Sequence, residues 1–425
     1  MSNGNDEPRF HDVADLPPRI RQRDDEEDGR GGYLYLPGSV LVADRAVESV
    51  ARKLRSRDGF RVGRRVVGGS RGLTLWEAPD EEAGDRVPEI VDRLLDEDLR
   101  WSPPQGPPPV TPNHVVFGAS HLAFGPASPV VPTSKRLTSA GGDDVGEGIR
   151  IAVFDSGLDL KEGTDDPESD FFDESLVGAR SDADEEPDAD SDGTLDIEAG
   201  HGTFIAGIIR QYAPAAQVRC FKVLSSDGFV DDASLAAALE DAAGFHIVNL
   251  SLGGPTARDS GLPALREKVI EMRDRNPWLV VVAAAGNAGS DDRWYPAAYP
   301  DVIGVGALDT ACSRKPGWSN FGPWVDVWAH GDRVTSTFLH WPGTNAGADD
   351  DVFEGWAEWS GTSFATPVVA AAIAARASES NPGRAQTPRA VHQAALEVLA
   401  HPLRDVDGAG NVVVVQPNKF VTESG

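Results

Sequence analysis

The sequence is poor in cysteine and in long apolar runs, and both shortages narrow the class of protein. Only 2 of the 425 residues are cysteine. Cys220 falls in a predicted core strand and Cys312 in a loop, so we expect no disulfide, which fits a reducing compartment. No apolar run reaches the roughly 18 residues of a membrane-spanning helix. The first residues have no basic segment and no apolar core, so we expect no secretory signal and a cytoplasmic protein.

Basic residues are scarce relative to acidic ones. The chain has 39 Lys and Arg against 68 Asp and Glu, which gives a formal net charge of −29. This charge disfavours phosphate backbones and anionic lipid surfaces, so we expect no nucleic acid and no membrane as a partner. The apolar content of 40% is that of an ordinary globular protein, and the length allows one large domain and a smaller one.

The most informative stretch is residues 360–367, with the sequence SGTSFATP. It precedes the apolar run 368–377, which predicts a buried helix. Ser363 would therefore lie where a tight turn at Gly361 enters that helix, beside N–H groups that can hold an oxyanion. A serine- and threonine-rich helix cap is the alternative interpretation of this stretch taken alone.

Three other short patterns supply what a nucleophilic serine needs. His201, in the pattern HGTFIAG, begins a predicted small-residue helix and can act as the base. Asp155 ends the predicted strand 149–154 and can orient the histidine. Asn287, in the pattern AAAGNAG, follows another predicted strand and offers an amide donor to an oxyanion. Each residue alone has an ordinary structural explanation, such as a turn or a satisfied core histidine.

The order Asp155, His201, Asn287, Ser363 within these patterns resembles the subtilisin-like serine proteases, or subtilases, over residues 147–399. Secondary matches are NLSLGG at 249–254, YPAAYP at 295–300 and WSNFG at 318–322. The resemblance implies a serine endopeptidase that acts on proteins or peptides through an acyl-enzyme. It also implies that the first, second and fourth of these residues form the catalytic triad, that Asn287 completes the oxyanion hole, and that the chemistry needs no cofactor.

The region 147–425 alternates between predicted strands and helices. Strands are expected at 149–154, 218–224, 246–250, 279–284 and 302–305, and helices at 203–211, 233–243, 262–276 and 363–377. This alternation predicts a doubly wound, mostly parallel α/β sheet with helices on both faces, which is also the subtilisin-like fold. Sites in such sheets lie beyond the carboxyl ends of strands, where Asp155, Ser251 and Asn287 each fall.

The first third of the chain has a different organisation. Residues 1–31 are predicted to be a disordered tail, 32–100 a small α+β domain and 101–146 a Pro/Gly-rich linker. The order β-α-β-β-α, with a further strand at 115–117, fits a ferredoxin-like sandwich. Subtilase propeptides are similar in architecture, which implies an intramolecular inhibitor that keeps the chain a zymogen. The alternative is an unrelated small domain that stays attached.

The resemblance also suggests which residues contact a substrate. Residues 251–253 would form the strand that binds the substrate backbone, and Gly228 would belong to the opposite rim. The residues of this set are Ser251, Leu252, Gly253, Gly228 and Trp294. Trp294 stands where the family usually has a small residue, at the base of the pocket for the side chain before the scissile bond. It predicts a shallow or lidded pocket that favours small side chains, unless the indole packs outward.

An acidic segment before His201 allows two interpretations. Asp188, Asp190 and Asp192 alternate as in a calcium-binding loop. The glutamate expected at the twelfth position of such a loop is missing, because Ala199 occupies that position and Glu198 comes one residue early. The segment is therefore either a solvated acidic insert or a site for structural calcium.

Two functions follow from the sequence. The first is an active intracellular endopeptidase, held or matured by its N-terminal domain. The second is a pseudo-protease or permanently inhibited zymogen that acts by binding. The complete set of catalytic residues argues against a dead enzyme but not against a silenced one.

Overall fold

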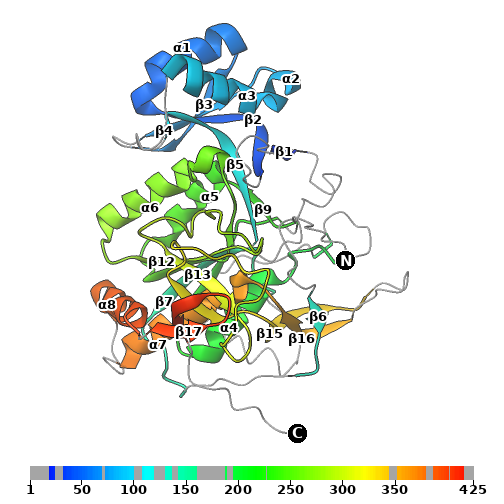
Figure 1. Cartoon of the computed structure of the whole chain (residues 1–425), viewed down its shortest axis with the longest axis vertical. Coiled ribbons are helices and arrows are strands. Elements are labelled where there is room, and N and C mark those ends of the chain that lie inside the picture. The colour runs from blue at the N-terminus through cyan, green and yellow to red at the C-terminus, as the bar shows by residue number, and fades with distance from the viewer. Residues whose placement is uncertain are drawn as a thin grey trace, which may run out of the picture.

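The structure is a computed structural model. It describes residues 19–23, 32–68, 72–99, 108–118, 130–135, 142–159, 187–188, 195–225, 227–343, 352–379, 386–401 and 403–415. The described residues form a small N-terminal unit, blue and cyan in Figure 1, and a larger unit that contains the later elements. No helix in these ranges is long and apolar enough to cross a membrane.

The larger unit is built on an eight-stranded sheet in the order β17-β18-β14-β13-β12-β10-β7-β8. Its strands are β7 (Arg150–Asp155), β8 (Gln217–Lys222), β10 (Ile247–Leu250), β12 (Val280–Ala284), β13 (Ile303–Leu308), β14 (Val327–His330), β17 (Leu403–Val406) and β18 (Gly410–Val415). Every neighbouring pair from β8 to β18 is parallel, and only β17 runs antiparallel to its neighbour. The predicted doubly wound, mostly parallel sheet is thus confirmed.

Helices cover both faces of this sheet. They are α4 (His201–Tyr212), α5 (Asp232–Ala238), α6 (Pro263–Arg275), α7 (Thr362–Glu379) and α8 (Pro388–Leu399), with the 3-10 turns η7 (Leu239–Ala242) and η8 (Ala257–Asp259). Alternate residues of β7 face opposite sides, as the period of a strand requires. Ile151 and Val153 join the core under α4, α7 and α8, whereas Ala152 and Phe154 join the core under α5 and α6.

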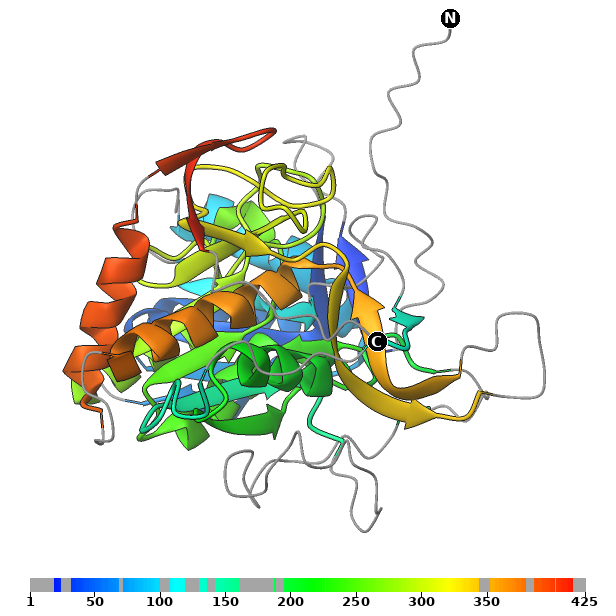
Figure 2. The same ribbon diagram turned by 90° about the horizontal axis from the view of Figure 1, so that it is seen from below.

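A separate three-stranded sheet lies against α4. It consists of β15 (Val334–Trp341), β16 (Phe353–Trp359) and β6 (Val131–Pro132), paired antiparallel. Figure 2 shows this gold hairpin extending to one side of the larger unit, while α7 in orange crosses its middle. The Ser336 hydroxyl donates to the Phe204 carbonyl at 2.8 Å, which ties the hairpin to α4. The sequence analysis did not predict this hairpin, which brings Trp359 next to the site.

The N-terminal unit has the topology expected of a ferredoxin-like sandwich. Its elements are β2 (Tyr33–Ala43), η2 (Asp44–Ala46), α1 (Val47–Asp58), β3 (Arg61–Val67), β4 (Leu73–Glu77), α2 (Glu81–Asp85), α3 (Val87–Arg93), the π-helical turn η4 (Leu94–Leu99) and β5 (Val110–Gly118). The sheet order is β5-β2-β4-β3, and all three pairings are antiparallel. One face of this sheet packs against α1 and α3 through residues such as Val50, Leu54 and Ile90.

Two strands of this unit, β1 and β5, extend beyond what the sequence predicts. The short strand β1 (Arg21–Arg23) pairs with β2, inside the predicted tail 1–31. Residues 1–18 and 24–31 of that predicted tail lie outside the described residues. The strand β5 confirms the strand expected at 115–117 but begins earlier, at Val110, inside the predicted linker 101–146, and it is buried along its whole length.

The strand β5 reaches from the small unit into the larger one (Figure 1). Its last residues pair antiparallel with β9 (Phe229–Asp231) on one side and with β11 (Leu252–Gly253) on the other. One seven-stranded sheet is therefore shared between the two units. This arrangement places the end of β5 beside the residues that the sequence selects as catalytic.

Candidate active site

The pair Asp155 and His201 is formed by the end of a strand and the start of a helix. Asp155 closes β7, and its Oδ1 lies 2.7 Å from Nδ1 of His201, the first residue of α4. The same oxygen accepts the N–H of Ser156 at 2.9 Å. Both side chains are 0% exposed. An ionised Asp155 makes Nδ1 the donor, so the ring keeps Nε2 available as the basic nitrogen.

Aromatic rings and one glycine hold the imidazole in place. The ring of Trp359 meets that of His201 edge-on at 5.5 Å between centroids, and the ring of Phe364 lies at 5.3 Å. Gly200 precedes the histidine with φ of 74°, a conformation that favours glycine. A Cβ at this position would also meet the Phe338 ring at 2.6 Å. The turn that starts α4 therefore requires glycine for two separate reasons.

Ser363 lies in the first turn of α7 and is fully buried. Its hydroxyl donates to the Ser251 carbonyl at 3.2 Å, and the Ser251 hydroxyl donates to the Ser363 carbonyl at 2.8 Å. In this structure the hydroxyl of the predicted nucleophile is thus turned to the strand that leads into β11 rather than to the imidazole. The next residue, Phe364, contacts His201, so the start of α7 and the start of α4 are neighbours.

The Asn287 side chain is oriented by its own oxygen. Oδ1 accepts the Thr362 N–H at 2.9 Å and the Thr362 hydroxyl at 3.0 Å. The Nδ2 group is buried and has no hydrogen-bond partner within the described ranges. It points towards Gly361, where a Cβ would lie 3.5 Å from it. A buried, aimed amide donor without a partner is the arrangement expected of an oxyanion hole before a substrate is bound.

The five residues predicted to contact substrate lie on or next to the elements that flank the end of β5. Leu252 pairs with Gly118 and Gly253 with Phe117, while the Gly228 carbonyl accepts the Gly118 N–H at 3.0 Å. Backbone groups from β11 and from the opposite rim therefore bind the same strand. Of the remaining two residues, Ser251 accepts a hydrogen bond from the Ser363 hydroxyl through its carbonyl. Trp294 packs against Gly253.

Trp294 points into the molecule and is 3% exposed. A Cβ on Gly253 would come within 2.5 Å of its indole ring, and a Cβ on Gly286 within 2.6 Å. The indole therefore fills the space between β11 and the loop that carries Asn287. On its outer edge it meets the ring of Phe117 at 5.4 Å with the ring planes nearly perpendicular. The alternative in which the indole packs outward is thus wrong, and the shallow pocket stays a prediction.

The sequence analysis missed one residue of the site. Glu198 is fully buried, and its Oε2 lies 3.4 Å from His201 Nδ1. Its carboxyl group packs against Gly118 of β5, and its methylene groups pack against Gly228. The sequence analysis considered it only as a misplaced calcium ligand. The i,i+3 spacing to His201 was the available signal, because residues three apart in a turn face the same side.

The described residues contain no group of three or more His, Cys, Asp or Glu able to hold a metal ion. Asp188 is described, whereas Asp190 and Asp192 lie outside the described residues, so the calcium loop stays a prediction. The carboxyl group of Glu198 lies between His201 and Gly118 instead.

The fold and site together define a class. A buried Asp–His pair, a serine at a helix N-terminus and an aimed amide, placed at one end of a parallel α/β sheet, are the parts of a serine hydrolase. Comparison with known proteins then gives the family. The family model described as "Subtilase family" matches residues 146–406. The chain belongs to the subtilase family and is a subtilisin-like serine endopeptidase.

Three relatives illustrate the extent of the similarity. Subtilisin BL from Lederbergia lenta is 35% identical over 240 residues, which are 54% of this chain and 76% of that protein. Subtilisin Savinase from the same organism is 34% identical over 240 residues, with the same coverage of 54% and 76%. M-protease from Shouchella clausii (strain KSM-K16) is 34% identical over 248 residues, 56% of each chain, so this chain spans about half the length of that relative. Subtilases need no cofactor for catalysis.

Proposed function

We propose that this endopeptidase cuts peptide bonds with Ser363 and that its own N-terminal domain occupies the cleft until the chain is processed. The observation that carries the proposal is the position of β5, which is hydrogen-bonded between β9 and β11 as an extended substrate would be. The buried Asp155–His201 pair supports the chemical part of the proposal.

The reaction begins when the Ser363 hydroxyl turns from the Ser251 carbonyl to Nε2 of His201. The oxygen attacks the peptide carbonyl while the imidazole takes its proton and then gives it to the leaving amine. Asp155 holds the ring and stabilises the imidazolium. Water then attacks the acyl-enzyme by the same route in reverse and releases the N-terminal product.

The Asn287 amide would bind the oxyanion that forms during both steps. Replacing Asn287 by Ala is expected to lower kcat about 10²–10³-fold, the loss already established for one such donor in a subtilisin. KM should change little, because the donor acts on charge that develops only in the transition state. Steady-state kinetics on a peptide substrate check both parameters. A variant that raised KM and kept kcat would show that the amide acts in ground-state binding.

Two measurements on the full chain test the activity and its control by the N-terminal domain. Intact-mass measurement of the wild-type chain beside Ser363→Ala should show loss of the N-terminal segment, ending shortly after Gly118, in the wild type only. Labelling by a fluorophosphonate probe should appear on the wild type after this loss and be absent from Ser363→Ala. Full-length masses for both chains, differing only by the oxygen atom that the substitution removes, together with no labelling of either chain, would reject the proposal.

A specific observation favours the second candidate function, a permanently inhibited binding protein. Asp155, His201 and Ser363 are all 0% exposed in this structure. A chain that stays intact, labels only when β5 is displaced and still binds a partner would fit that alternative. The intact-mass comparison therefore separates the two functions before any substrate is known.

The place of action and the partners belong to the same proposal. We propose a cytoplasmic enzyme that acts on proteins or peptides and binds neither nucleic acid nor membranes. Cys220 and Cys312 are buried thiols rather than a disulfide, and the net charge of −29 supports the absence of polyanionic partners. Cell fractionation of the native protein checks the location, and recovery in an extracellular fraction would contradict it.

Structural calcium at Asp188, Asp190 and Asp192 is the last part of the proposal. The alternating acidic pattern supports it, and the missing twelfth glutamate weakens it. A thermal melt in millimolar calcium should lie above the melt in chelator if a site exists. Identical melts would leave the segment as a solvated acidic insert.

A further inference from the structure

We propose that Glu198 closes the subsite for the second residue before the scissile bond, so that this enzyme cuts peptides with glycine at that position. The inference rests on the proposed protease function and names the substrate class of the same cleft. It starts from one contact. Gly118 of β5 lies against the Glu198 carboxyl group, in the part of the groove next to His201.

The register of β5 identifies the subsite. Gly118 is opposite Leu252, and its N–H donates to the Gly228 carbonyl at 3.0 Å. Ser251 precedes Leu252 and binds the nucleophile through its carbonyl. A peptide in this antiparallel register places the residue with the scissile carbonyl opposite Ser251, one position after that of Gly118. Gly118 therefore marks the second residue before the cleaved bond.

The Glu198 side chain fills the space that a side chain would need there. A Cβ at Gly118 would lie 2.6 Å from Cδ and Oε2 and 2.8 Å from Oε1 of Glu198. Such distances lie far inside van der Waals contact. The backbone of Gly118 is not in the left-handed region, so its conformation is open to any residue. The carboxyl group, and not the backbone, selects glycine at this position.

The Glu198 side chain has little room to swing aside. A Cβ added to Gly228 would lie only 2.3 Å from the Cγ of Glu198. The methylene groups of Glu198 are therefore packed directly against that glycine. Its Oε2 is 3.4 Å from His201 Nδ1, and the whole side chain is 0% exposed. Moving it would separate a buried carboxylate from the histidine that becomes positively charged during the reaction. A substrate with a side chain at this position would have to offset that cost.

The neighbouring positions of β5 accept large side chains instead. Val116 joins the apolar cluster that contains Leu252 and Val230, and Phe117 packs between Phe229 and Trp294. In the sequence Gly118 is followed by Ala119, which agrees with a first pocket already filled by the indole. The preferred substrate is therefore an apolar residue, an aromatic residue, glycine and a small residue, in that order before the cut.

The first experiment measures this preference directly. Internally quenched peptides contain Val-Phe-Xaa-Ala before Ser, with Gly, Ala, Lys or Asp as Xaa, and the enzyme is the purified full-length chain after self-processing. Fluorophosphonate titration gives the concentration of active sites. We expect kcat/KM for the glycine peptide to exceed that for the alanine peptide at least about tenfold. In Glu198→Ala this ratio should fall towards one.

A matched variant separates size from charge. Glu198→Gln keeps the volume of the side chain, so the preference for glycine should persist even if the overall rate falls. The ratio of two substrates on one variant cancels any effect on His201 that is common to both. Equal cleavage of the glycine and alanine peptides, a preference for lysine, or an unchanged ratio in Glu198→Ala would overturn the inference. Absence of labelling and of all cleavage would instead remove the proposed function.

The second experiment needs no turnover and tests the same contact within the chain. In the full-length Ser363→Ala background, Gly118→Ala should speed hydrogen exchange of the β5 amides at least about tenfold, because the new methyl group meets Glu198. Adding Glu198→Ala should restore slow exchange. Gly317→Ala, where nothing lies within 4 Å of the new methyl group, serves as the control. Unchanged exchange in Gly118→Ala, or no restoration in the double variant, would refute the role of Glu198.

Discussion

Two of the contacts between the N-terminal domain and the catalytic domain use different chemistry. The free face of the N-terminal sheet contributes Leu41, Leu73 and Leu75, which pack against small residues of α5 and α6. The end of β5 lies in the cleft, where backbone groups of β9 and β11 bind it on both sides. The first contact is made by apolar side chains and the second mainly by the main chain.

This difference assigns a separate role to each contact. Apolar burial contributes free energy in proportion to area and tolerates changes of detail, so the sheet face determines how strongly the domain is held. A backbone ladder binds almost any sequence, so its register depends on the few side chains that come close. In the cleft these are Glu198 and Trp294, which lie against Gly118 and Phe117.

The largest expected effect comes from placing a charge in the sheet-face contact. Ala236 of α5 is 0% exposed and belongs to the cluster with Leu41 and Leu75, not to the core beneath its own helix. Ala236→Glu would bury an unpaired carboxylate while the domain is docked, but not once it has left, at a cost of about 3 kcal/mol or more. In Ser363→Ala protein, hydrogen exchange of β5 should therefore accelerate at least about a hundredfold.

The neighbouring position supplies a control for this prediction. Ala237 is exposed on the same helix, so Ala237→Glu should leave the exchange of β5 unchanged. If Ala236→Glu left β5 protected, the cleft contact alone would hold the domain, and the division between strength and register would be wrong.

A drop in pH is expected to weaken the docking of the N-terminal domain by an intermediate amount. The responsible group, His114, lies on β5, so this effect probes the contact of that strand rather than that of the sheet face. Burial lowers the pKa of His114 to about 3, and its Nε2 accepts the Ala257 N–H at 3.0 Å across the two domains. The undocked histidine, with an ordinary pKa of about 6.5, binds a proton that the docked one cannot accept. Docking is therefore complete above pH 6.5 and weakens as pH falls, by about 2 kcal/mol at pH 5.

The measurement is exchange of β5 in Ser363→Ala protein between pH 7 and pH 5, corrected for the intrinsic rate. His114→Gln should remove the extra acceleration, because glutamine also accepts the N–H but does not titrate. His246 is the matched control. Burial, followed by the charge of Arg150, lowers its pKa to about 4, but it lies within the catalytic domain. An identical pH dependence in His114→Gln would assign the effect to other groups.

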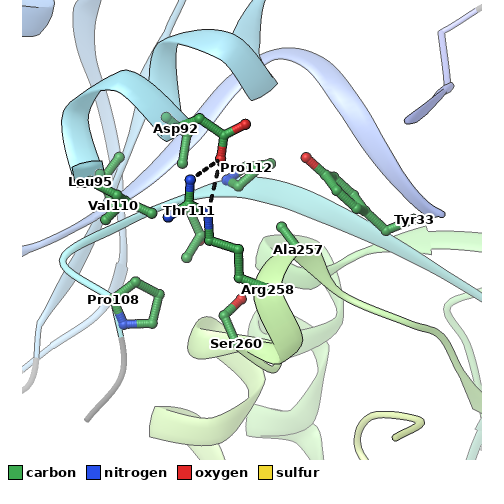
Figure 3. A pocket seen from close by; sticks show the side chains of 11 residues that line it. Tyr33, Asp92, Leu95, Pro108, Val110, Thr111, Pro112, Ala257, Arg258 and Ser260 are labelled. Atoms are coloured by element: carbon green, nitrogen blue, oxygen red, sulfur yellow. Dashed lines mark hydrogen bonds and ion pairs between the residues drawn. The ribbon is translucent and has the colours of Figure 1, made fainter. Parts of the chain in front are cut away.

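The smallest effect is expected from an ion pair at the rim of the domain interface (Figure 3). Arg258 of η8 reaches Asp92 at 2.9 Å and donates to Asp96 at 2.7 Å. These side chains are 30%, 33% and 55% exposed, so solvent screens the attraction. Arg258→Ala should weaken docking by less than about 1 kcal/mol and only at low salt. A loss as large as that of Ala236→Glu would contradict the proposed ranking.

Much of the fold followed from local patterns in the sequence. The strands β7 and β12 are continuous apolar runs, which is how strands buried on both faces are recognised. Asp155 at the end of such a strand and His201 at the start of a helix could both be predicted from the alternation of strands and helices along the chain. The βαββαβ order of the N-terminal domain was also visible, although its last strand β5 lay inside a segment predicted as linker.

The missed features share one physical cause. The role of Glu198, the docking of the hairpin β15–β16 on α4 and the path of β5 all depend on contacts between segments that are distant in the sequence. Glu198 has no motif of its own, and its role appears only when Gly118 and Gly228 are seen to surround it. The segment 342–351 that joins the strands of the hairpin is rich in the turn-forming residues Pro, Gly, Asn and Asp, but no local pattern indicates the contact of Trp359 with His201.

The sequence by itself therefore determined the candidate catalytic residues, the family and the alternation of the sheet, because each is encoded within a few neighbouring positions. Only the tertiary structure decided that β5 lies in the cleft, that Trp294 points inward and that a second carboxylate adjoins the histidine. These depend on distances between atoms that the chain brings together through space, and such distances are set by packing rather than by local periodicity.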